Sequence, residues 1–231
     1  MSEVLLAALR LSVDLADHTV LEGVALTASA GEVVGVVGAN GAGKTTLLRA
    51  CAGLLPEATG ELSLSGIDPR RTAPATLATL RAYGPQHPTS AWDYTLAELG
   101  QLAPSAEAFH RWCARFGLGA SATRRLSELS GGERKVAHLS LSFCALGDAY
   151  GKVLLLDEPT TALDLCRAEL VARAVRASAQ AGAAVLVATH DLAWARTCDQ
   201  VLVLSEGRLI AAGPPETALT AELVRATWGV A

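Results

Sequence analysis

The sequence is short of several residue types, and each shortage narrows the choice of function. Aromatic residues make up 4% of the 231 residues, and lysine occurs only at Lys44, Lys135 and Lys152. No apolar run approaches the roughly 18 residues that cross a bilayer, and the first residues lack the pattern of a signal peptide. We therefore expect a cytoplasmic protein. If it works at a membrane, a partner must supply the spans.

Charge and cysteine content argue against two further classes. The formal net charge is −4, so the overall field does not favour nucleic acid, and we expect no nucleic-acid partner. The five cysteines form no C-x-x-C pair, which argues against a zinc site or a disulfide framework. We expect all five to be buried or half-buried free thiols.

The pattern of apolar residues predicts an α/β fold. Continuous apolar runs, typical of strands covered on both faces, alternate with helical segments and lie at 32–37, 153–156 and 183–188. Residues 4–30 alternate in places between apolar and polar, which predicts two or three antiparallel strands with a turn at Asp17-His18. Residues 87–146 carry helical spacing without a strong strand signal. These patterns predict a parallel α/β sheet and an inserted helical lobe.

A glycine-rich segment supplies the strongest functional signal. Gly38-Ala39-Asn40-Gly41-Ala42-Gly43-Lys44-Thr45 matches the P-loop pattern G-x-x-x-x-G-K-[ST], between an apolar strand and a helix opening. Glycines let backbone N–H groups crowd around phosphate oxygens, and the helix N-terminus adds positive potential. Lys44 suits the β- and γ-phosphates, and the Thr45 hydroxyl suits Mg²⁺. The predicted nucleotide contacts are Gly38, Asn40, Gly41, Ala42, Gly43, Lys44, Thr45 and Thr46. A glycine turn before an ordinary helix is the alternative.

Two carboxylates, Asp157 and Glu158, end the buried strand 153–156. In an open α/β sheet, that end of a strand faces the ligand crevice. We predict that Asp157 holds Mg²⁺, directly or through water, and that Glu158 polarises a water for in-line attack on the γ-phosphate. The alternative is an acidic strand end that caps the following helix.

A second glycine motif, Leu129-Ser130-Gly131-Gly132-Glu133, precedes an apolar helical run. Its Ser-x-x-Glu spacing is that of a capping box. A cap does not require two glycines, however, and glycine is costly in the first turn of a helix. Ser130, Gly131 and Gly132 also form an anion site at a helix N-terminus. We predict that they face phosphate as well as capping the helix.

Single polar residues complete the candidate site. His190 follows the strand at 183–188 and is predicted to donate to the γ-phosphate. Gln86, in the loop after Pro85, is a candidate contact for Mg²⁺ or for the attacking water. Trp92 and Trp112 are predicted to pack within the helical lobe rather than to stack on a nucleotide.

Together these motifs resemble the ATP-binding-cassette (ABC) ATPases over nearly the whole chain. The P-loop, Gln86, residues 129–133, Asp157-Glu158-Pro159, Ala162-Leu163-Asp164 and His190 occur in that family's order. The resemblance implies an α/β P-loop NTPase core of the RecA type, with an antiparallel β edge and an inserted helical subdomain. Residues 1–86 and 150–231 would form the core with its β edge. Residues 87–149 would form the subdomain that carries the LSGGE motif.

The resemblance also implies how the protein works. ATP, with Mg²⁺, would lie between the P-loop of one cassette and Ser130, Gly131 and Gly132 of another, in a head-to-tail homodimer. ATP would close the dimer and hydrolysis would open it. The loop at Gln86 would pass this motion to an integral-membrane permease on the inner face of the cell membrane. A full system would include an extracytoplasmic substrate-binding protein.

Finer features resemble importers within the family. The single short cassette and the tail from 199 to 229 resemble ATPases for iron-siderophore, haem or vitamin B12 uptake, and Ala91-Trp92-Asp93-Tyr94 is similar to manganese and zinc importers. An exporter cassette, or a soluble ABC ATPase acting on ribosomes or DNA, is the alternative. The chain departs from the family pattern in two places. Leu15, with His18 nearby, stands where an aromatic usually stacks on adenine, and Val136 stands where an arginine is frequent.

Overall fold

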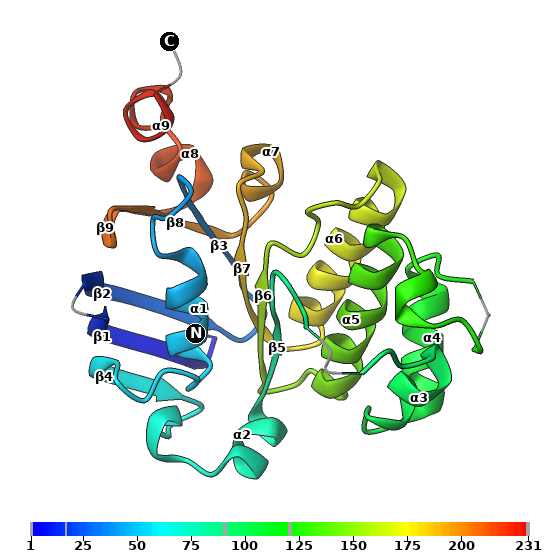
Figure 1. Cartoon of the computed structure of the whole chain (residues 1–231). Coiled ribbons are helices and arrows are strands. Elements are labelled where there is room, and N and C mark those ends of the chain that lie inside the picture. The colour runs from blue at the N-terminus through cyan, green and yellow to red at the C-terminus, as the bar shows by residue number, and fades with distance from the viewer. Residues whose placement is uncertain (1, 17, 90–91, 120–121, 230–231) are drawn as a thin grey trace.

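A six-stranded sheet forms the centre of the computed structural model, which describes residues 2–16, 18–89, 92–119 and 122–229. Five strands are parallel and β9 runs antiparallel to β8. In spatial order they are β5 (Arg81–Gly84), β6 (Val153–Asp157), β7 (Ala184–Ala188), β3 (Val33–Gly38), β8 (Gln200–Ser205) and β9 (Arg208–Gly213). A second, antiparallel sheet has the order β2 (His18–Ser29), β1 (Val4–Leu15) and β4 (Thr59–Leu64) (Figure 1).

Helices cover both faces of the central sheet. The α-helices are α1 (Lys44–Cys51), α2 (Pro74–Leu80), α3 (Leu96–Gln101), α4 (Ala106–Arg115), α5 (Gly131–Leu146), α6 (Leu165–Gln180), α7 (Leu192–Ala195), α8 (Pro215–Ala218) and α9 (Ala221–Trp228). Short 3-10 turns lie at Pro69–Arg71 and Leu126–Glu128. Helix α1 contacts strands of both sheets, whereas α5 and α6 pack on the opposite face of the central sheet, with α3 and α4 outside α5 (Figure 1).

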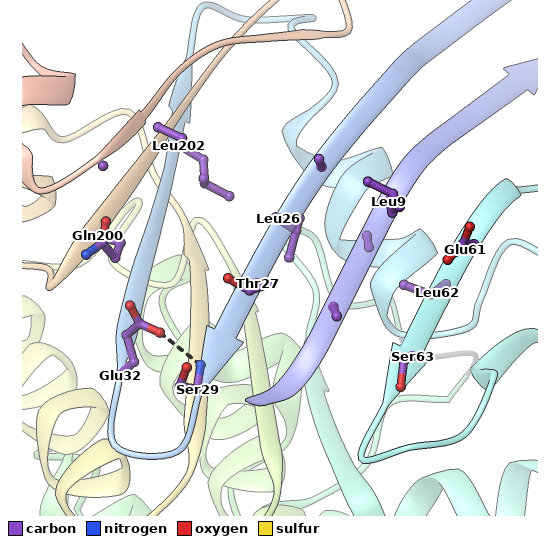
Figure 2. A pocket seen from close by; sticks show the side chains of 15 residues that line it. Leu9, Leu26, Thr27, Ser29, Glu32, Glu61, Leu62, Ser63, Gln200 and Leu202 are labelled. Carbon is purple, nitrogen blue, oxygen red and sulfur yellow. Dashed lines mark hydrogen bonds between the residues drawn. The ribbon is translucent and has the colours of Figure 1, made fainter. Parts of the chain in front are cut away.

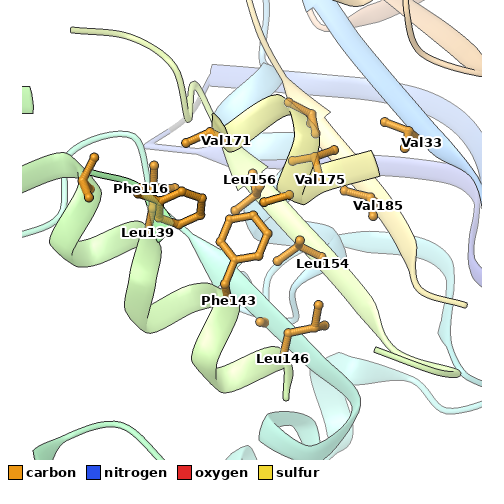
Figure 3. Packing of buried hydrophobic residues seen from close by; sticks show 14 of the residues in the cluster. Val33, Phe116, Leu139, Phe143, Leu146, Leu154, Leu156, Val171, Val175 and Val185 are labelled. Atoms are coloured by element: carbon orange, nitrogen blue, oxygen red, sulfur yellow. The ribbon is translucent and has the colours of Figure 1, made fainter. Parts of the chain in front are cut away.

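The continuous apolar runs arise because the central strands are buried on both faces. Along β6, Leu154 and Leu156 join the core beneath α5 and α6, while Val153 and Leu155 join the core around α1. Successive side chains of a strand point to opposite faces, so each face needs its own apolar residues. Figure 3 shows Phe143 of α5 among the side chains of the first of these cores.

Most of the predicted secondary structure is present, and the α/β prediction is confirmed. The antiparallel segment 4–30 forms two long strands. The turn predicted there includes Asp17, which lies outside the described residues. Helices α7 and α8 were not predicted, because each has only four residues and gives no helical period. No helix in the described part of the chain is both long and apolar enough to cross a membrane.

Two predictions about individual side chains are wrong. Cys166 is exposed, whereas the other four cysteines are buried as free thiols. Trp92 is 72% exposed rather than buried in the lobe core. Trp112 does pack there, with its ring 4.8 Å from that of Phe143. Trp92 lies in the loop before α3 and Cys166 in the first turn of α6, and the sequence pattern does not show whether another segment covers either position.

Candidate functional site

The predicted P-loop leaves the carboxyl end of β3 and opens α1. Close packing requires glycine at two of its positions. A Cβ on Gly38 would lie 2.3 Å from the carbonyl oxygen of Leu204. Gly43 has a φ of +99°, and a Cβ there would lie 2.7 Å from the Leu21 side chain. The loop therefore keeps its backbone conformation only with glycine at these two positions.

Lys44 turns back over this loop. Its side chain is buried, and Nζ donates to the carbonyl oxygens of Gly38 at 2.8 Å and Ala39 at 3.1 Å. The ammonium group is thus held at the centre of the loop. A positive charge at this place would offset the electrostatic cost of bringing phosphate oxygens close together.

A cavity of about 410 Å³ opens beside the loop. Its lining comes from β2, the P-loop, the loop after β5 and the end of β6: Val20, Asn40, Gly41, Ala42, Gly43, Lys44, Thr45, Thr46, Gln86, Asp157 and Glu158. The structure therefore brings the predicted P-loop residues together with Gln86 and both predicted carboxylates. Among its described lining residues, none comes from the second glycine motif.

A larger hollow, of about 850 Å³, lies elsewhere, lined by residues of the three-stranded sheet and of strands β8 and β9 (Figure 2). Its lining is mainly alanine and leucine, and the Glu32 carboxylate there accepts from the Ser29 amide at 2.9 Å. None of the described residues that line it belongs to a predicted motif. Size alone does not mark the reactive site of this molecule.

Asp157 has the features of a cation ligand. It is 1% exposed, and neither carboxylate oxygen has a hydrogen-bond partner in the described part of the chain. Burial raises the pKa of Asp157, while the nearby Thr45 hydroxyl and the charges of Lys135 and Lys44 oppose the rise. Unpaired carboxylate oxygens beside a hydroxyl are donors that a hard cation such as Mg²⁺ prefers. The residues therefore fit the ion that the sequence predicts.

Glu158 is held rigidly next to it. Its φ is +48°, an uncommon conformation for a residue with a side chain. Oε2 is hydrogen-bonded to two side chains: it accepts from the Thr161 hydroxyl at 3.0 Å and lies 2.6 Å from Nδ1 of His190. No described residue forms a hydrogen bond with Oε1. One oxygen of Glu158 is thus fixed by the protein, and the other is open to a water in the cavity.

Sequence reasoning found His190 but gave it a different partner. The structure places His190 against Glu158, with 60% of its side chain exposed. Nδ1 carries the proton if it donates to the carboxylate, which leaves Nε2 turned away from that bond. Thr161 was missed, because a hydroxyl three residues beyond a carboxylate is common and carries no distinctive pattern.

The second glycine motif forms the capping box that its spacing predicts. Ser130 Oγ accepts from the Glu133 amide at 3.2 Å, and the Glu133 carboxylate accepts from the Ser130 amide at 2.9 Å. Arg124 also donates to both Glu133 oxygens, at 3.0 and 3.2 Å. The Arg124 guanidinium and the Ser130 amide lower the pKa of Glu133 to about 2. The start of α5 is therefore held by its own chain, away from the P-loop cavity.

Comparison with known proteins decides the family. The family model described as "ABC transporter" matches residues 21–161. A hemin import ATP-binding protein of Roseobacter denitrificans is 37% identical, covering 96% of this chain and 92% of that protein.

The chain belongs to the ABC transporter ATPases.

Other matches agree with this assignment. The cassette is 36% identical to a cobalamin import ATP-binding protein of Halobacterium salinarum, over 94% of this chain and 57% of that protein. A solved structure of an ATP-binding subunit of an ABC transporter superposes with a TM-score of 0.80 at 27% identity, covering 97% of this chain and 93% of the other. The cassette is accordingly an ATP-binding enzyme that hydrolyses ATP.

The structure also locates the two departures from the family pattern. Leu15 is half-buried and His18 exposed, and neither lines the P-loop cavity. Val20 on β2 does line it, and sequence reasoning missed this residue. Val136 is fully buried in the core beneath α5 and α6, so it contributes packing rather than a surface charge.

Proposed function

We propose that this cassette drives an importer for a metal chelate, with haem, cobalamin and iron-siderophores as the cargo class. The two import proteins described above support this, since one is named for hemin and the other for cobalamin. Uptake of manganese or zinc ions rests only on the Ala91-Trp92-Asp93-Tyr94 resemblance, in which Ala91 lies outside the described residues. The cavity that joins the P-loop to Asp157 and Glu158 is the observation that carries the enzymatic part of the proposal.

ATP binds at the P-loop in this account. Backbone amides of Gly41, Gly43 and Lys44 face the phosphates, and the Lys44 ammonium supplies positive charge. The Thr45 hydroxyl, the Asp157 carboxylate and the Gln86 amide would hold Mg²⁺, which would neutralise charge on the phosphate oxygens. The remaining predicted contacts, Gly38, Asn40, Ala42 and Thr46, complete the loop and the first turn of α1.

Glu158 is the general base. Its Oε1 accepts a hydrogen bond from the attacking water, while Thr161 and His190 hold Oε2 and fix the plane of the carboxylate. His190 can donate from Nε2 to the γ-phosphate at the same time only as an imidazolium, with a proton on each ring nitrogen. Such positioning favours in-line attack because the reacting groups are aligned before the reaction begins.

A second cassette completes the site. Ser130, Gly131 and Gly132 do not line the cavity of their own chain, and a Cβ on Gly131 would have no atom within 4 Å. Packing within the chain therefore does not explain glycine at this position. An approaching phosphate does, because the first-turn amides of α5 lack partners within the helix. We infer a head-to-tail homodimer in which each motif faces the ATP of the other protomer.

The helical subdomain, residues 87–149, links this site to a membrane partner. The core, residues 1–86 and 150–231, holds ATP, and Gln86 stands at the junction between the two parts. We place the cassette on the inner face of the cell membrane, bound to integral-membrane permease subunits that supply the spans. An extracytoplasmic substrate-binding protein delivers the cargo.

The test is to isolate the complex and drive transport with it. Membranes from the source cell are solubilised in mild detergent, the tagged cassette is captured, and its partners are identified by mass spectrometry. We expect a polytopic permease. The complex, reconstituted in liposomes with ATP enclosed, should take up haem, cobalamin or a siderophore chelate. The Glu158→Gln cassette is the matched control, which should capture the same permease without uptake.

Other results would overturn parts of the proposal. Transport of cargo out of the liposomes, away from the side on which ATP is hydrolysed, would make the protein an exporter. Capture of ribosomal or DNA-bound proteins without a permease would point to an ABC ATPase that acts outside transport. Equal ATP hydrolysis by the wild type and Glu158→Gln would remove Glu158 from the reaction.

A further inference from the structure

All three lysines of the chain are fixed to backbone carbonyl oxygens. Lys44 lies over the P-loop, and Lys152 donates to the carbonyl of Leu146, at the carboxyl end of α5, at 2.8 Å. Lys135 donates to the carbonyl of Gln86, also at 2.8 Å. The first belongs to the nucleotide site and the second stabilises a helix end. Lys135 joins two parts of the molecule and has no role in the mechanism described above.

Lys135 connects the lobe helix to the loop that carries Gln86. It lies on the second turn of α5, just after the glycine motif, and its side chain is buried at 7% exposure. Its target is the backbone of a residue whose side chain lines the P-loop cavity. If this bond broke, a buried ammonium group would be left without its hydrogen-bond acceptor, which costs free energy. The bond therefore holds the loop in place.

A second attachment holds the strand before this loop. Farther along α5, the Ser142 hydroxyl lies 3.4 Å from the carbonyl oxygen of Tyr83 and 3.3 Å from that of His138, and its one proton is shared between these two acceptors. A Cβ on Gly84 would lie 3.0 Å from the same hydroxyl, so helix and strand are in close contact. Helix α5 therefore holds the strand at one place and the Gln86 loop at another. Of these two attachments, only Lys135 acts on the loop itself.

The charge of Lys135 also interacts with the reactive carboxylates. Burial lowers the pKa of Lys135, and the negative charges of Asp157 and Glu158 oppose that change. The ammonium group thus lies within electrostatic reach of both carboxylates while it is bonded to Gln86. A neutral side chain there would lose the bond and this favourable interaction together.

We propose that Lys135 is a positioning residue that holds the Gln86 loop so that the Gln86 side chain faces the Mg²⁺ side of the cavity. Movement of α5 is thereby transmitted to Gln86 through one side chain. The inference rests on the proposed role of Gln86. It adds that a residue of the lobe, outside the cavity lining, controls how well Gln86 performs that role.

Lys135→Met tests this, because methionine has a similar length and no donor. With purified full-length cassette, we expect kcat for ATP hydrolysis to fall about tenfold, the scale of one lost hydrogen bond. The Mg²⁺ concentration at half-maximal rate should rise several-fold, while KM for ATP stays within about twofold because the P-loop is unchanged. Lys152→Met is the matched control. It should lower Tm without changing the Mg²⁺ dependence.

The double mutant separates positioning from general damage. In a Gln86→Ala background, Lys135→Met should cause a much smaller loss of kcat than in the wild type, because most of its effect acts through the missing Gln86 side chain and only the interaction of its charge with the carboxylates remains. Hydrogen exchange supplies a measurement without turnover: amides at 84–89 should exchange faster in Lys135→Met and as in wild type in Lys152→Met. If Lys135→Met fails to fold, Lys135→Gln takes its place, with faster exchange at 84–89 and the same non-additivity expected.

Three results would overturn the inference. Full additivity of Lys135→Met and Gln86→Ala would show that Lys135 acts elsewhere. Unchanged exchange at 84–89 would show that the bond does not hold the loop. If Gln86→Ala alone has no effect on kcat or Mg²⁺ dependence, the proposed role of Gln86 fails and the inference fails with it. The exchange result would still report separately whether Lys135 fixes the loop.

Discussion

The chain carries two glycine motifs at helix N-termini. They differ in whether the polar side chains beside them find hydrogen-bond partners within the chain. At the P-loop, the buried Asp157 has two oxygens without a hydrogen bond from any described residue. At the second motif, Ser130, Glu133 and Arg124 satisfy one another in a closed network. The first site presents carboxylate oxygens that its own chain does not satisfy, whereas the second is satisfied by its own chain.

This difference predicts that the two motifs tolerate different changes. A buried carboxylate without a hydrogen bond costs folding free energy, and we expect a protein to keep one where a ligand offsets that cost. A capped helix end is stable by itself and offers its amides outward. Substitutions beside the P-loop should therefore increase the stability of the free protein while they lower its activity. Substitutions at the second motif should not have this opposite effect on the two properties. The following predictions test this comparison, from the largest effect to the smallest.

Glu158→Gln should have the largest effect. The amide keeps the shape of the side chain but cannot take a proton from water, so we expect kcat for ATP hydrolysis to fall about 100-fold or more. KM for ATP should change little, because Glu158 is not among the phosphate contacts. Steady-state hydrolysis with an ATP titration measures both quantities. A loss confined to KM would contradict the assignment of Glu158 as the base.

Asp157→Asn should separate function from stability. Hydrolysis should fall about 100-fold as the Mg²⁺ ligand is weakened, and the Mg²⁺ requirement should rise. Without Mg²⁺ and nucleotide, however, Tm should increase by about 2–4 °C, since the buried unpaired charge is gone. Thermal unfolding in EDTA checks this, with the exposed Asp148→Asn as control. A lower Tm for Asp157→Asn would mean that the carboxylate is not a strained group in the free protein.

Thr161→Val should have an intermediate effect. The change removes the hydroxyl that holds Glu158 Oε2 and keeps the shape of the side chain, so kcat should fall about tenfold with KM unchanged. Thr161→Ser keeps the donor and should retain most of the activity. Equal losses in the valine and serine variants would show that packing, rather than the hydrogen bond, is what matters at this position.

Glu133→Gln should have the smallest effect, and it should depend on pH. The folded state holds the pKa of Glu133 at about 2, below its ordinary 4.5, so the ionised pair with Arg124 stabilises the fold above pH 4.5. That contribution is lost as pH falls towards 2. We expect a Tm difference of about 2 °C or less at pH 7, because the pair lies near the surface. Thermal scans should show the difference closing between pH 4.5 and 2. A constant difference would rule out the ion pair as its source.

The sequence identified the parts of the site that follow one another along the chain. The P-loop is a continuous pattern, and Asp157-Glu158 ends a strand whose apolar run is unmistakable. Contacts between distant segments left no such pattern. Lys135 reaches Gln86 across 49 positions, and His190 meets Glu158 across 32. Val20 lines the cavity because β2 folds over the P-loop, a tertiary contact that local periodicity does not encode.

The central claim is that one active site needs the P-loop of one protomer and the second glycine motif of another. Lys44→Met should inactivate the first, and Gly131→Asp should repel phosphate at the second. The Gly131→Asp variant should fold well, because a Cβ at Gly131 meets no atom within 4 Å and acidic residues are favourable at a helix N-terminus. Each variant alone should be inactive.

The decisive measurement is ATP hydrolysis by an equal mixture of these two variants. In a mixed head-to-tail dimer, one site combines both substitutions and the other has neither, so about a quarter of the wild-type sites should be restored. Recovery of activity on mixing would establish that the site is shared between protomers. If the mixture stays inactive although mixed dimers form, each chain must supply its own second motif, and the shared site does not exist.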